Sequence, residues 1–239
     1  MKKFQSVCAL GAILFMAVAC APAERTENDP IETVNRGMFA VNEGIDMVLI
    51  SPLAHGYRAI TTKGMRRGVS NALYNLTEPV TVVNSLLQGD VTNAFTSCWR
   101  FILNTTLGFA GFYDFAGKYG GLPARKEDFG QTFAVWGMGE GPYLVLPIIG
   151  PSNLRDTVGL VGDILVNPVT WLPSDYDEFT YGVAGATIIT QRESAIELID
   201  GIYETSLDPY ATFRSGYIQR RNAMIKNRGT RKVGVGYGQ

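Results

Sequence analysis

The sequence predicts a mostly helical fold, and three observations support this prediction. Helix start signals recur along the chain, an apolar stripe repeats with helical spacing, and a single segment has the composition of an extended strand. Charged residues make up only 18% of the 239 residues, against about 25% in a typical soluble domain. With 46% hydrophobic residues the chain is too apolar to be disordered. Its net charge of −1 gives no bulk attraction for nucleic acid.

The N-terminus is predicted to be a processing signal. Residues 1–19 begin with Met1-Lys2-Lys3 and continue with an apolar run that is shorter than the roughly 20 residues needed to span a bilayer. Cys20 follows a small residue, as the lipidated cysteine of a bacterial lipobox does, although Ala17 stands where leucine is usual. An ordinary cleavage site that leaves an unmodified Cys20 thiol also fits. On the lipobox interpretation, residues 20–28 are a lipidated tether.

Helix starts in the remaining chain are marked by capping residues and by proline in the first turn. Asp29-Pro30 with Glu32 is a complete start signal, Asp208-Pro209 repeats its first half, and Asp175 with Glu178 has capping-box spacing. From these signals we expect helices over 30–50, 52–75, 78–88, 90–107, 152–166, 176–205 and 208–227. They form one helical domain over 29–227, followed by a basic, glycine-rich tail at 228–239.

The expected helix at 90–107 has two contrasting faces. One face is apolar and the other is polar but nearly uncharged. The apolar stripe contains Val91, Ala94, Phe95, Cys98, Trp99 and Ile102, and the polar face contains Thr92, Asn93, Thr96, Ser97, Arg100 and Asn104. A wide apolar face can pack in a protein core or contact lipid, and the sequence alone leaves both open.

The segment 137–151 is the one extended part of the prediction. Glycines precede an apolar run that has proline at both ends, Pro142 and Pro151, and Pro147 within it. This composition favours an extended segment or a hairpin over a helix. Because no other strand is expected, we predict a lone hydrophobic loop of the kind that contacts a ligand or a membrane. No apolar stretch after Cys20 is long enough to cross a bilayer as a helix.

The sequence contains little that points to chemistry. His55 is the single histidine, which excludes a histidine-based metal cluster, and no G-x-S-x-G motif is present. We therefore predict no catalytic residue, no metal and no cofactor. Four acids lie on one face of the expected helix 176–205, namely Glu193, Glu197, Asp200 and Glu204. An ordinary solvated face fits them, and so does an acidic surface that faces a channel or a basic partner.

A series of collinear motifs covers residues 29 to about 222. They are Asp29-Pro30 with Asn35, Arg36 and Phe39; Asn75 with Glu78-Pro79; Asn84 with Gln88-Gly89; Arg100 with Asn104; Gly111 with Asp114; Glu127 to Thr132; Gly141-Pro142-Tyr143 with Leu146-Pro147; Gly150 to Ser152 with Arg155-Asp156; and Asp208-Pro209-Tyr210. Through these motifs the chain resembles the MlaA/VacJ family of outer-membrane lipoproteins.

The resemblance implies an all-α ring of amphipathic helices that lies in one leaflet of a Gram-negative outer membrane, anchored on the periplasmic side, around a central channel. It implies a protein that binds a trimeric porin, removes mislocalised phospholipids from the outer leaflet and passes them to a soluble periplasmic carrier. The family-motif candidates are Asn35, Arg36, Phe39, Arg100, Asn104, Arg155 and Asp156, and the channel or loop candidates are Pro142, Tyr143, Leu146, Pro147 and Gly150. Two alternatives stay open, a lipoprotein-anchored periplasmic lipid hydrolase and a purely structural envelope lipoprotein.

Overall fold

The computed structural model describes residues 29–226. The predicted signal peptide, Cys20 and the tail from residue 228 lie outside the described residues. The elements are α2 (Glu32–Ile45), a π-helical turn η2 (Asp46–Ile50), α3 (Ser51–Ile60), α4 (Lys63–Asn75), α5 (Glu78–Leu87), α6 (Val91–Thr106), α7 (Phe115–Lys118), α8 (Phe129–Val135), β1 (Tyr143–Leu146), β2 (Gly150–Asn153), α9 (Leu154–Val166), the 3₁₀ turns η3 (Pro168–Trp171) and η4 (Ser174–Tyr176), α10 (Asp177–Ser194), α11 (Ile196–Thr205) and α12 (Pro209–Lys226).

The prediction of a mostly helical chain is confirmed, but two of the expected helices are broken. The helix expected at 52–75 divides into α3 and α4, because Thr61 is extended and Thr62 begins a new helix by accepting a hydrogen bond from the backbone N–H of Met65 at 3.3 Å. The helix expected at 176–205 divides at Ala195 into α10 and α11. The short helices α7 and α8 were not expected, although each begins at a capping aspartate.

The segment 137–151 is not a lone loop, so that prediction is wrong. Strand β1 pairs antiparallel with β2, with Tyr143 opposite Asn153 and Leu146 opposite Gly150. The second strand was hidden because its sequence, Gly-Pro-Ser-Asn, consists of residues that are mostly depleted in strands. The helix expected from residue 152 begins only at Leu154, after the side chain of Asn153 caps it.

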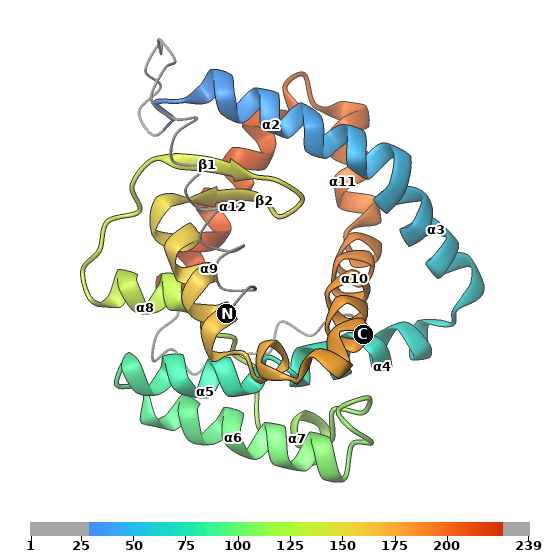
Figure 1. Cartoon of the computed structure of the whole chain (residues 1–239), viewed down its shortest axis with the longest axis vertical. Coiled ribbons are helices and arrows are strands. Elements are labelled where there is room, and N and C mark those ends of the chain that lie inside the picture. Colours follow the sequence, from blue (N-terminus) through green and yellow to red (C-terminus); the bar gives the residue numbers. More distant parts are fainter. Residues whose placement is uncertain (1–28, 227–239) are drawn as a thin grey trace.

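The elements follow one another around a ring (Figure 1). Helix α2 contacts β1, α3 and α4 contact α10, α4 contacts α6, and α6 packs on α5. The ring closes through α5 against α8 and α9, and through α9 and α12 against β2. Helices α8 and α9 approach so closely that a Cβ atom on Gly159 would lie 2.3 Å from the backbone nitrogen of Gly130. Glycine at position 159 is therefore a condition of this crossing.

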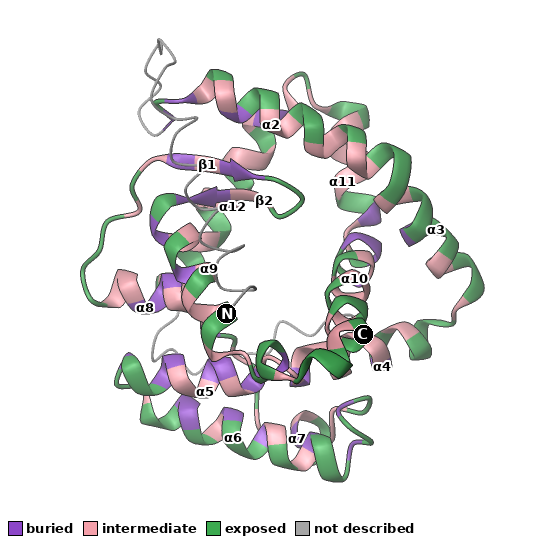
Figure 2. Ribbon diagram, in the orientation of Figure 1, coloured by how far each residue is buried: buried purple, intermediate pink, exposed green. Residues whose placement is uncertain are grey.

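The interior of the ring wall is polar. Among the described residues, 21 with polar or charged side chains are buried, against 11 with hydrophobic ones. The largest side chains that are fully buried include Gln131, Glu78 and Asn84, and the buried residues lie where elements meet (Figure 2). Buried polar groups are stable only when they are hydrogen-bonded, so this wall is held together by a hydrogen-bond network as much as by apolar packing.

Candidate functional site

Helix α6 turns its apolar stripe outward. Phe95 is 64% exposed and Trp99 is 53% exposed, while the polar Ser97 and Arg100 on the opposite face are 0% and 3% exposed. The polar face packs on α5, where Asn93 donates a hydrogen bond to the Ser85 hydroxyl at 2.7 Å. Of the two possibilities that the sequence left open for this stripe, packing in the protein core is thus excluded for its large side chains.

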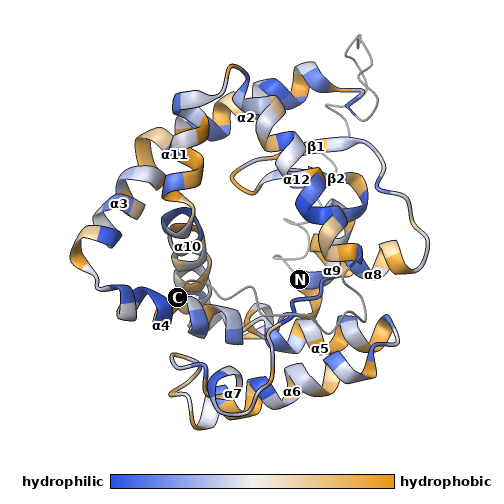
Figure 3. Ribbon diagram, turned by 180° about the vertical axis from the view of Figure 1, so that it is seen from behind, coloured by the Kyte–Doolittle hydropathy of each residue, from blue (hydrophilic) through white to orange (hydrophobic). Residues whose placement is uncertain are grey.

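Large apolar side chains are exposed on other elements as well. Orange, hydrophobic stretches follow α6, α8 and α9 in Figure 3. Exposed large apolar residues outside α6 include Met47, Val48 and Leu49 of η2, Ile148 and Ile149 of the hairpin turn, and Val158, Val161, Ile164 and Leu165 of α9. Large apolar side chains exposed in this number are typical of contact with a partner or a membrane. Within residues 29–226 no helix combines the length and the hydrophobicity that crossing a bilayer requires.

The two motif candidates of α6, Arg100 and Asn104, lie together in a buried cluster. The Arg100 guanidinium donates to Glu78 at 2.7 Å, and another of its nitrogens lies 3.2 Å from Asp114. Asn104 donates to Asp114 at 3.0 Å and accepts a hydrogen bond from the backbone N–H of Ala116 at 2.9 Å. Burial raises the pKa of Glu78, and Arg100 opposes that shift. The cluster therefore joins α5, α6 and α7 through ion pairs and hydrogen bonds, with Glu78 and Arg100 buried and Asp114 partly exposed.

Helix α2 holds the hairpin through two asparagines, seven residues apart. Asn35 donates to the carbonyl of Tyr143 at 2.9 Å and accepts from the N–H of Val145 at 3.0 Å, as a neighbouring strand would. Asn42 likewise donates to the carbonyl of Leu146, the last residue of β1, and accepts from the N–H of Ile148 in the turn, both at 2.8 Å. The position of the hairpin in the ring is thereby fixed by side-chain amides. The role of Asn42 was missed, because its i, i+7 spacing from Asn35 was the only signal in the sequence.

The five loop candidates have different surroundings in the hairpin. Tyr143 and Leu146 are buried, at 2% and 5% exposure, and the carbonyl of Pro142 accepts from the N–H of Leu154 at 3.1 Å. Pro147 lies at the exposed turn, and Gly150 has a φ of 87° that favours glycine. The hairpin is therefore anchored at its base and presents apolar side chains at its turn.

Arg36 and Phe39 join α2 to α12. Arg36 donates to both carboxylate oxygens of Asp208, at 3.1 and 2.7 Å, and its guanidinium lies 4.4 Å from the centre of the Tyr210 ring. The hydrogen bond from Arg36 holds the pKa of Asp208 below its ordinary value. The Phe39 ring packs on Tyr210 and Phe213, with centroids 5.7 and 5.6 Å apart.

Arg155 and Asp156 lie in a second buried network. Arg221 of α12 donates to both oxygens of Asp128, at 2.7 and 2.6 Å, and to Asp156 at 2.9 Å, while Arg155 donates to Asp156 at 3.1 Å. Burial disfavours the ionised form of Asp128, but Arg221 outweighs this effect and keeps the pKa of Asp128 below its ordinary value. Whereas the first cluster joins consecutive elements, this one connects α8 and α9 to α12, which lies far from them in the sequence.

Two further buried acids, Glu127 and Asp163, lie beside this network, and Glu127 lies 3.2 Å from Arg125. Burial raises the pKa of Glu127 to about 7 and the pKa of Asp163 to about 7. Glu127 accepts from the side chain of Gln88 at 3.2 Å, and Asp163 accepts from the N–H of Phe129 at 3.1 Å. Asp163 was missed by the sequence analysis, although an acid within the apolar run of α9 was a usable signal.

The four acids expected on one helix face are separated by the break at Ala195. Glu193 is buried and lies 2.7 Å from Arg58 and 3.0 Å from Arg66. Glu197 also pairs with Arg58, and Asp200 pairs with Arg192 at 2.6 Å, whereas Glu204 is exposed. Three of the four therefore form ion pairs that join elements, and the prediction of one continuous acidic face is wrong.

His55 lies 3.3 Å from the carboxylate of Asp200, and about half of its side chain is exposed. Among the described residues no serine hydroxyl is hydrogen-bonded to it, so the part of the chain that the structure describes contains no Ser-His-Asp triad. Within that same part, no group of three or more His, Cys, Asp or Glu side chains is placed to hold a metal ion.

Comparison with known proteins agrees with this arrangement of a helical wall, a polar network and an apolar exterior. A family model described as "MlaA lipoprotein" matches residues 27–224. The chain belongs to the MlaA lipoprotein family. It is 35% identical over 236 residues to the "Intermembrane phospholipid transport system lipoprotein MlaA" of Escherichia coli (strain K12), which is 97% of this chain and 92% of that protein.

Two further relatives extend the comparison. A protein of Rickettsia bellii (strain RML369-C) is 40% identical over 199 residues, which is 83% of this chain and 77% of that protein. A solved structure described as "Structural basis for maintenance of bacterial outer membrane lipid asymmetry" contains a similar chain, with a TM-score of 0.70 and 35% sequence identity. The match covers 84% of this chain and 100% of that one.

Proposed function

We propose that this chain is an outer-membrane lipoprotein that maintains lipid asymmetry by intermembrane phospholipid transport. It removes mislocalised phospholipids from the outer leaflet through an amphipathic channel and passes them to a soluble periplasmic carrier. The name of the Escherichia coli relative and the description of the solved structure support this proposal. The transport breaks no covalent bond, so the chain acts without a catalytic residue, a metal or a cofactor.

The observation that carries the proposal is that the ring wall has apolar side chains on its exterior and polar side chains in its interior, the reverse of a water-soluble protein. Large apolar residues such as Phe95, Trp99 and Val48 are more than half exposed, whereas Glu78, Asn84 and Arg100 are buried. Lipid tails in place of water stabilise such an exterior, since burying apolar surface contributes about 25 cal/mol per Å². Helices that lie in one leaflet fit an apolar exterior on a chain whose described helices are too short or too polar to span a bilayer.

The proposal also places the parts of the chain that the structure does not describe. Residues 1–19 are a signal peptide that is removed, and Cys20 carries the lipid anchor at the start of a tether over 20–28. The helical ring over 29–227 lies in the leaflet that faces the periplasm and surrounds the amphipathic channel. The hairpin turn lies near the channel mouth, and residues 228–239 form a basic tail.

Two protein partners complete the proposal. A trimeric outer-membrane porin covers part of the apolar exterior, and a soluble periplasmic carrier accepts the lipid that leaves the channel. Co-purification of the full-length protein in mild detergent tests this, with porin and bound phospholipid as the expected companions. Recovery of the protein with neither companion would contradict the proposal.

Deletion of the gene in its native host tests the function itself. We expect phospholipid to accumulate in the outer leaflet and the cells to become sensitive to detergent, and we expect the wild-type gene to restore both. An unchanged outer leaflet would instead support a purely structural lipoprotein. A His55→Ala variant that complements fully would remove the hydrolase alternative, and mass spectrometry of the mature N-terminus should find an acylated Cys20.

A further inference from the structure

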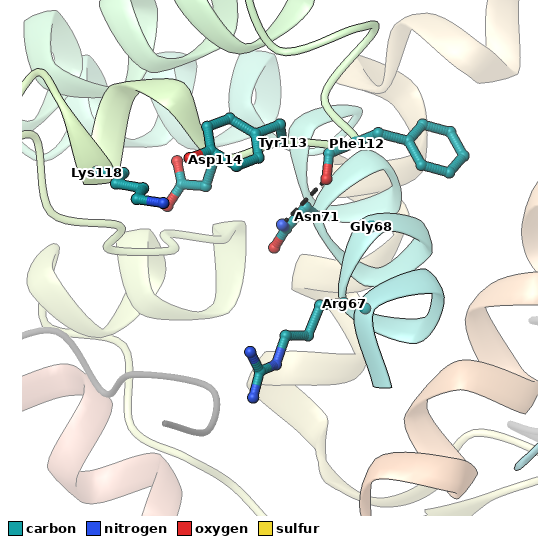
Figure 4. A pocket seen from close by; sticks show the side chains of 8 residues that line it. Arg67, Gly68, Asn71, Phe112, Tyr113, Asp114 and Lys118 are labelled. Atoms are coloured by element: carbon teal, nitrogen blue, oxygen red, sulfur yellow. Dashed lines mark hydrogen bonds between the residues drawn. The ribbon is translucent and has the colours of Figure 1, made fainter. Parts of the chain in front are cut away.

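A pocket of about 340 Å³ lies between α4 and the segment that joins α6 to α7. Arg67 and Lys118 extend toward it from opposite sides (Figure 4). Its walls are mainly apolar, with the ring of Phe112 and the surface of Gly68 among them. The volume is at the lower end of the roughly 300–1,000 Å³ that small-molecule sites occupy.

The two cations of this pocket are not neutralised by the protein. Among the described residues, neither Arg67 nor Lys118 has a carboxylate within ion-pair distance, and Lys118 instead lies over the ring of Tyr113, 5.2 Å from its centre. The one acid that lines the pocket, Asp114, is already engaged by Arg100 and Asn104. The pocket therefore has an excess of positive charge beside apolar walls, which suits an anion that carries an apolar group.

The walls of the pocket are held in place by specific contacts. The ring of Phe112 lies so close to α4 that a Cβ atom on Gly68 would be 2.9 Å from it, and Asn71 donates to the carbonyl of Phe112 at 3.3 Å. On the other wall, Asp114 caps α7 by accepting from the N–H of Gly117 at 3.1 Å. The buried Arg100 cluster fixes Asp114, and so it also fixes the short helix that carries Lys118.

The loop that leads to the pocket presents apolar side chains in a strained backbone. Phe109 and Ala110 have φ values of 52° and 56°, which non-glycine residues rarely adopt, and such strain is often associated with a functional site. The strained turn is held by backbone bonds from Ala110 to the carbonyl of Thr105 and from Tyr113 to that of Gly108, at 3.0 and 2.9 Å. It leaves the Phe109 ring 83% exposed. Phe109, three residues before the pocket-lining Phe112, thus presents an exposed apolar ring that an acyl chain can contact.

We propose that Arg67 and Lys118 bind the phosphodiester of a phospholipid head group in this pocket, with Phe112 and the neighbouring loop against the glycerol and the acyl chains. This inference rests on the proposed function, because it assigns a head-group site to the transported lipid. Arg and Lys are the side chains that bind phosphate through charge-assisted hydrogen bonds, and an apolar wall beside them distinguishes a lipid phosphate from free phosphate.

The test is a binding experiment on the full-length protein in an amphipathic polymer free of lipid. Three ligands are titrated by calorimetry: dihexanoylphosphatidylglycerol, dihexanoylglycerol, which lacks the phosphate, and inorganic phosphate. The variants are Arg67→Gln, Lys118→Gln, their double and Phe112→Ala. The matched control is Lys63→Gln, a basic residue one turn before Arg67 on the same helix that does not line the pocket.

We expect each single charge removal to weaken phosphatidylglycerol binding about tenfold, equal to about 1.4 kcal/mol, and the double variant to lose more. The Kd of Lys63→Gln for phosphatidylglycerol should stay within about twofold of the wild-type value, well short of a tenfold change. Dihexanoylglycerol binding should not depend on Arg67 or Lys118. Added salt should weaken the binding of phosphatidylglycerol more than that of dihexanoylglycerol.

Two results overturn the proposal. If the double variant binds phosphatidylglycerol as wild type does, the pocket is not the head-group site. If inorganic phosphate binds as tightly as the lipid and Phe112→Ala changes neither, the ligand is free phosphate. Failure of the proposed function is separate, because deletion of the gene would then leave the outer leaflet unchanged whatever these titrations find.

Discussion

The buried ion pair of Glu78 and Arg100 should dominate the stability of the wall around α5 and α6. The side chains of Glu78 and Arg100 are 0% and 4% exposed, and they are joined at 2.7 Å. Replacing Arg100 with methionine keeps much of the volume but leaves the Glu78 carboxylate buried without its cation. Removing one partner of a buried pair usually costs about 3–5 kcal/mol.

The magnitude follows from what Glu78 must do in the Arg100→Met variant. Its carboxylate has to be protonated in the folded state, and for an ordinary glutamate pKa of about 4.3 this costs about 3.7 kcal/mol at pH 7 but about 1 kcal/mol at pH 5. For a chain of this size 1 kcal/mol corresponds to roughly 2–4 °C in Tm. We therefore expect Tm to fall by about 7–15 °C at pH 7 and by only a few degrees at pH 5.

Thermal unfolding of the detergent-solubilised protein, followed by circular dichroism at both pH values, measures these shifts. The double variant Glu78→Gln with Arg100→Met removes both charges and should regain most of the lost Tm at pH 7. Arg220→Met, an exposed position on α12, serves as the control. A fall in Tm of less than about 2 °C for Arg100→Met would refute the reasoning, because a loss of several kcal/mol in the free energy of unfolding lowers Tm by more than that. A fall in Tm that is equal at pH 5 and pH 7 would refute it as well.

Three other predictions concern the exterior, the buried acids and the hairpin. Replacing both Phe95 and Trp99 with glutamate should lower Tm in lipid nanodiscs by about 10 °C or more, because a carboxylate in hydrocarbon costs several kcal/mol; little change would mean that α6 faces water. Burial raises the pKa of Asp163 to about 7. Between about pH 4 and 7 the folded chain therefore holds a proton that the unfolded chain releases, and the free energy of unfolding falls as pH rises. Asp163→Asn should therefore raise Tm relative to wild type more at pH 8 than at pH 4, and an equal difference at both would contradict this. Asn35→Ala leaves the Tyr143 carbonyl without its partner and should cost about 1–3 kcal/mol and speed proteolysis of the hairpin, as unfolding and limited digestion can measure.

The sequence was sufficient to predict helices where capping signals and periodicity agree. The expected helix 90–107 corresponds to α6, and its two faces were correctly separated. Which face points inward was not predictable, because periodicity identifies a stripe but not the medium on either side of it. Phe95 outside and Ser97 inside reverse the usual rule for water-soluble proteins.

Long-range pairing was the other part that the sequence could not supply. The acids at 193–204 have helical spacing, but the break at Ala195 and the partners Arg58, Arg66 and Arg192 are tertiary features. The family motifs identified residues that matter to the structure, but the sequence did not show what those residues do. Asn35 and Arg100 are structural members of buried networks, whereas the pocket cations, Arg67 and Lys118, belonged to no motif.

The polar interior has a consequence for how the protein responds to temperature. Exposing apolar surface to water raises the heat capacity on unfolding, and exposing polar surface lowers it. In this wall the fully buried side chains include Glu78, Thr81, Asn84 and Gln131, and much of the apolar surface is already exposed in the folded state. The heat-capacity change should therefore be small for the chain length, and stability should vary gently between cold and warm conditions. A calorimetric stability curve flatter than that of a soluble helical domain of equal size is the expected signature of an interior built from hydrogen bonds.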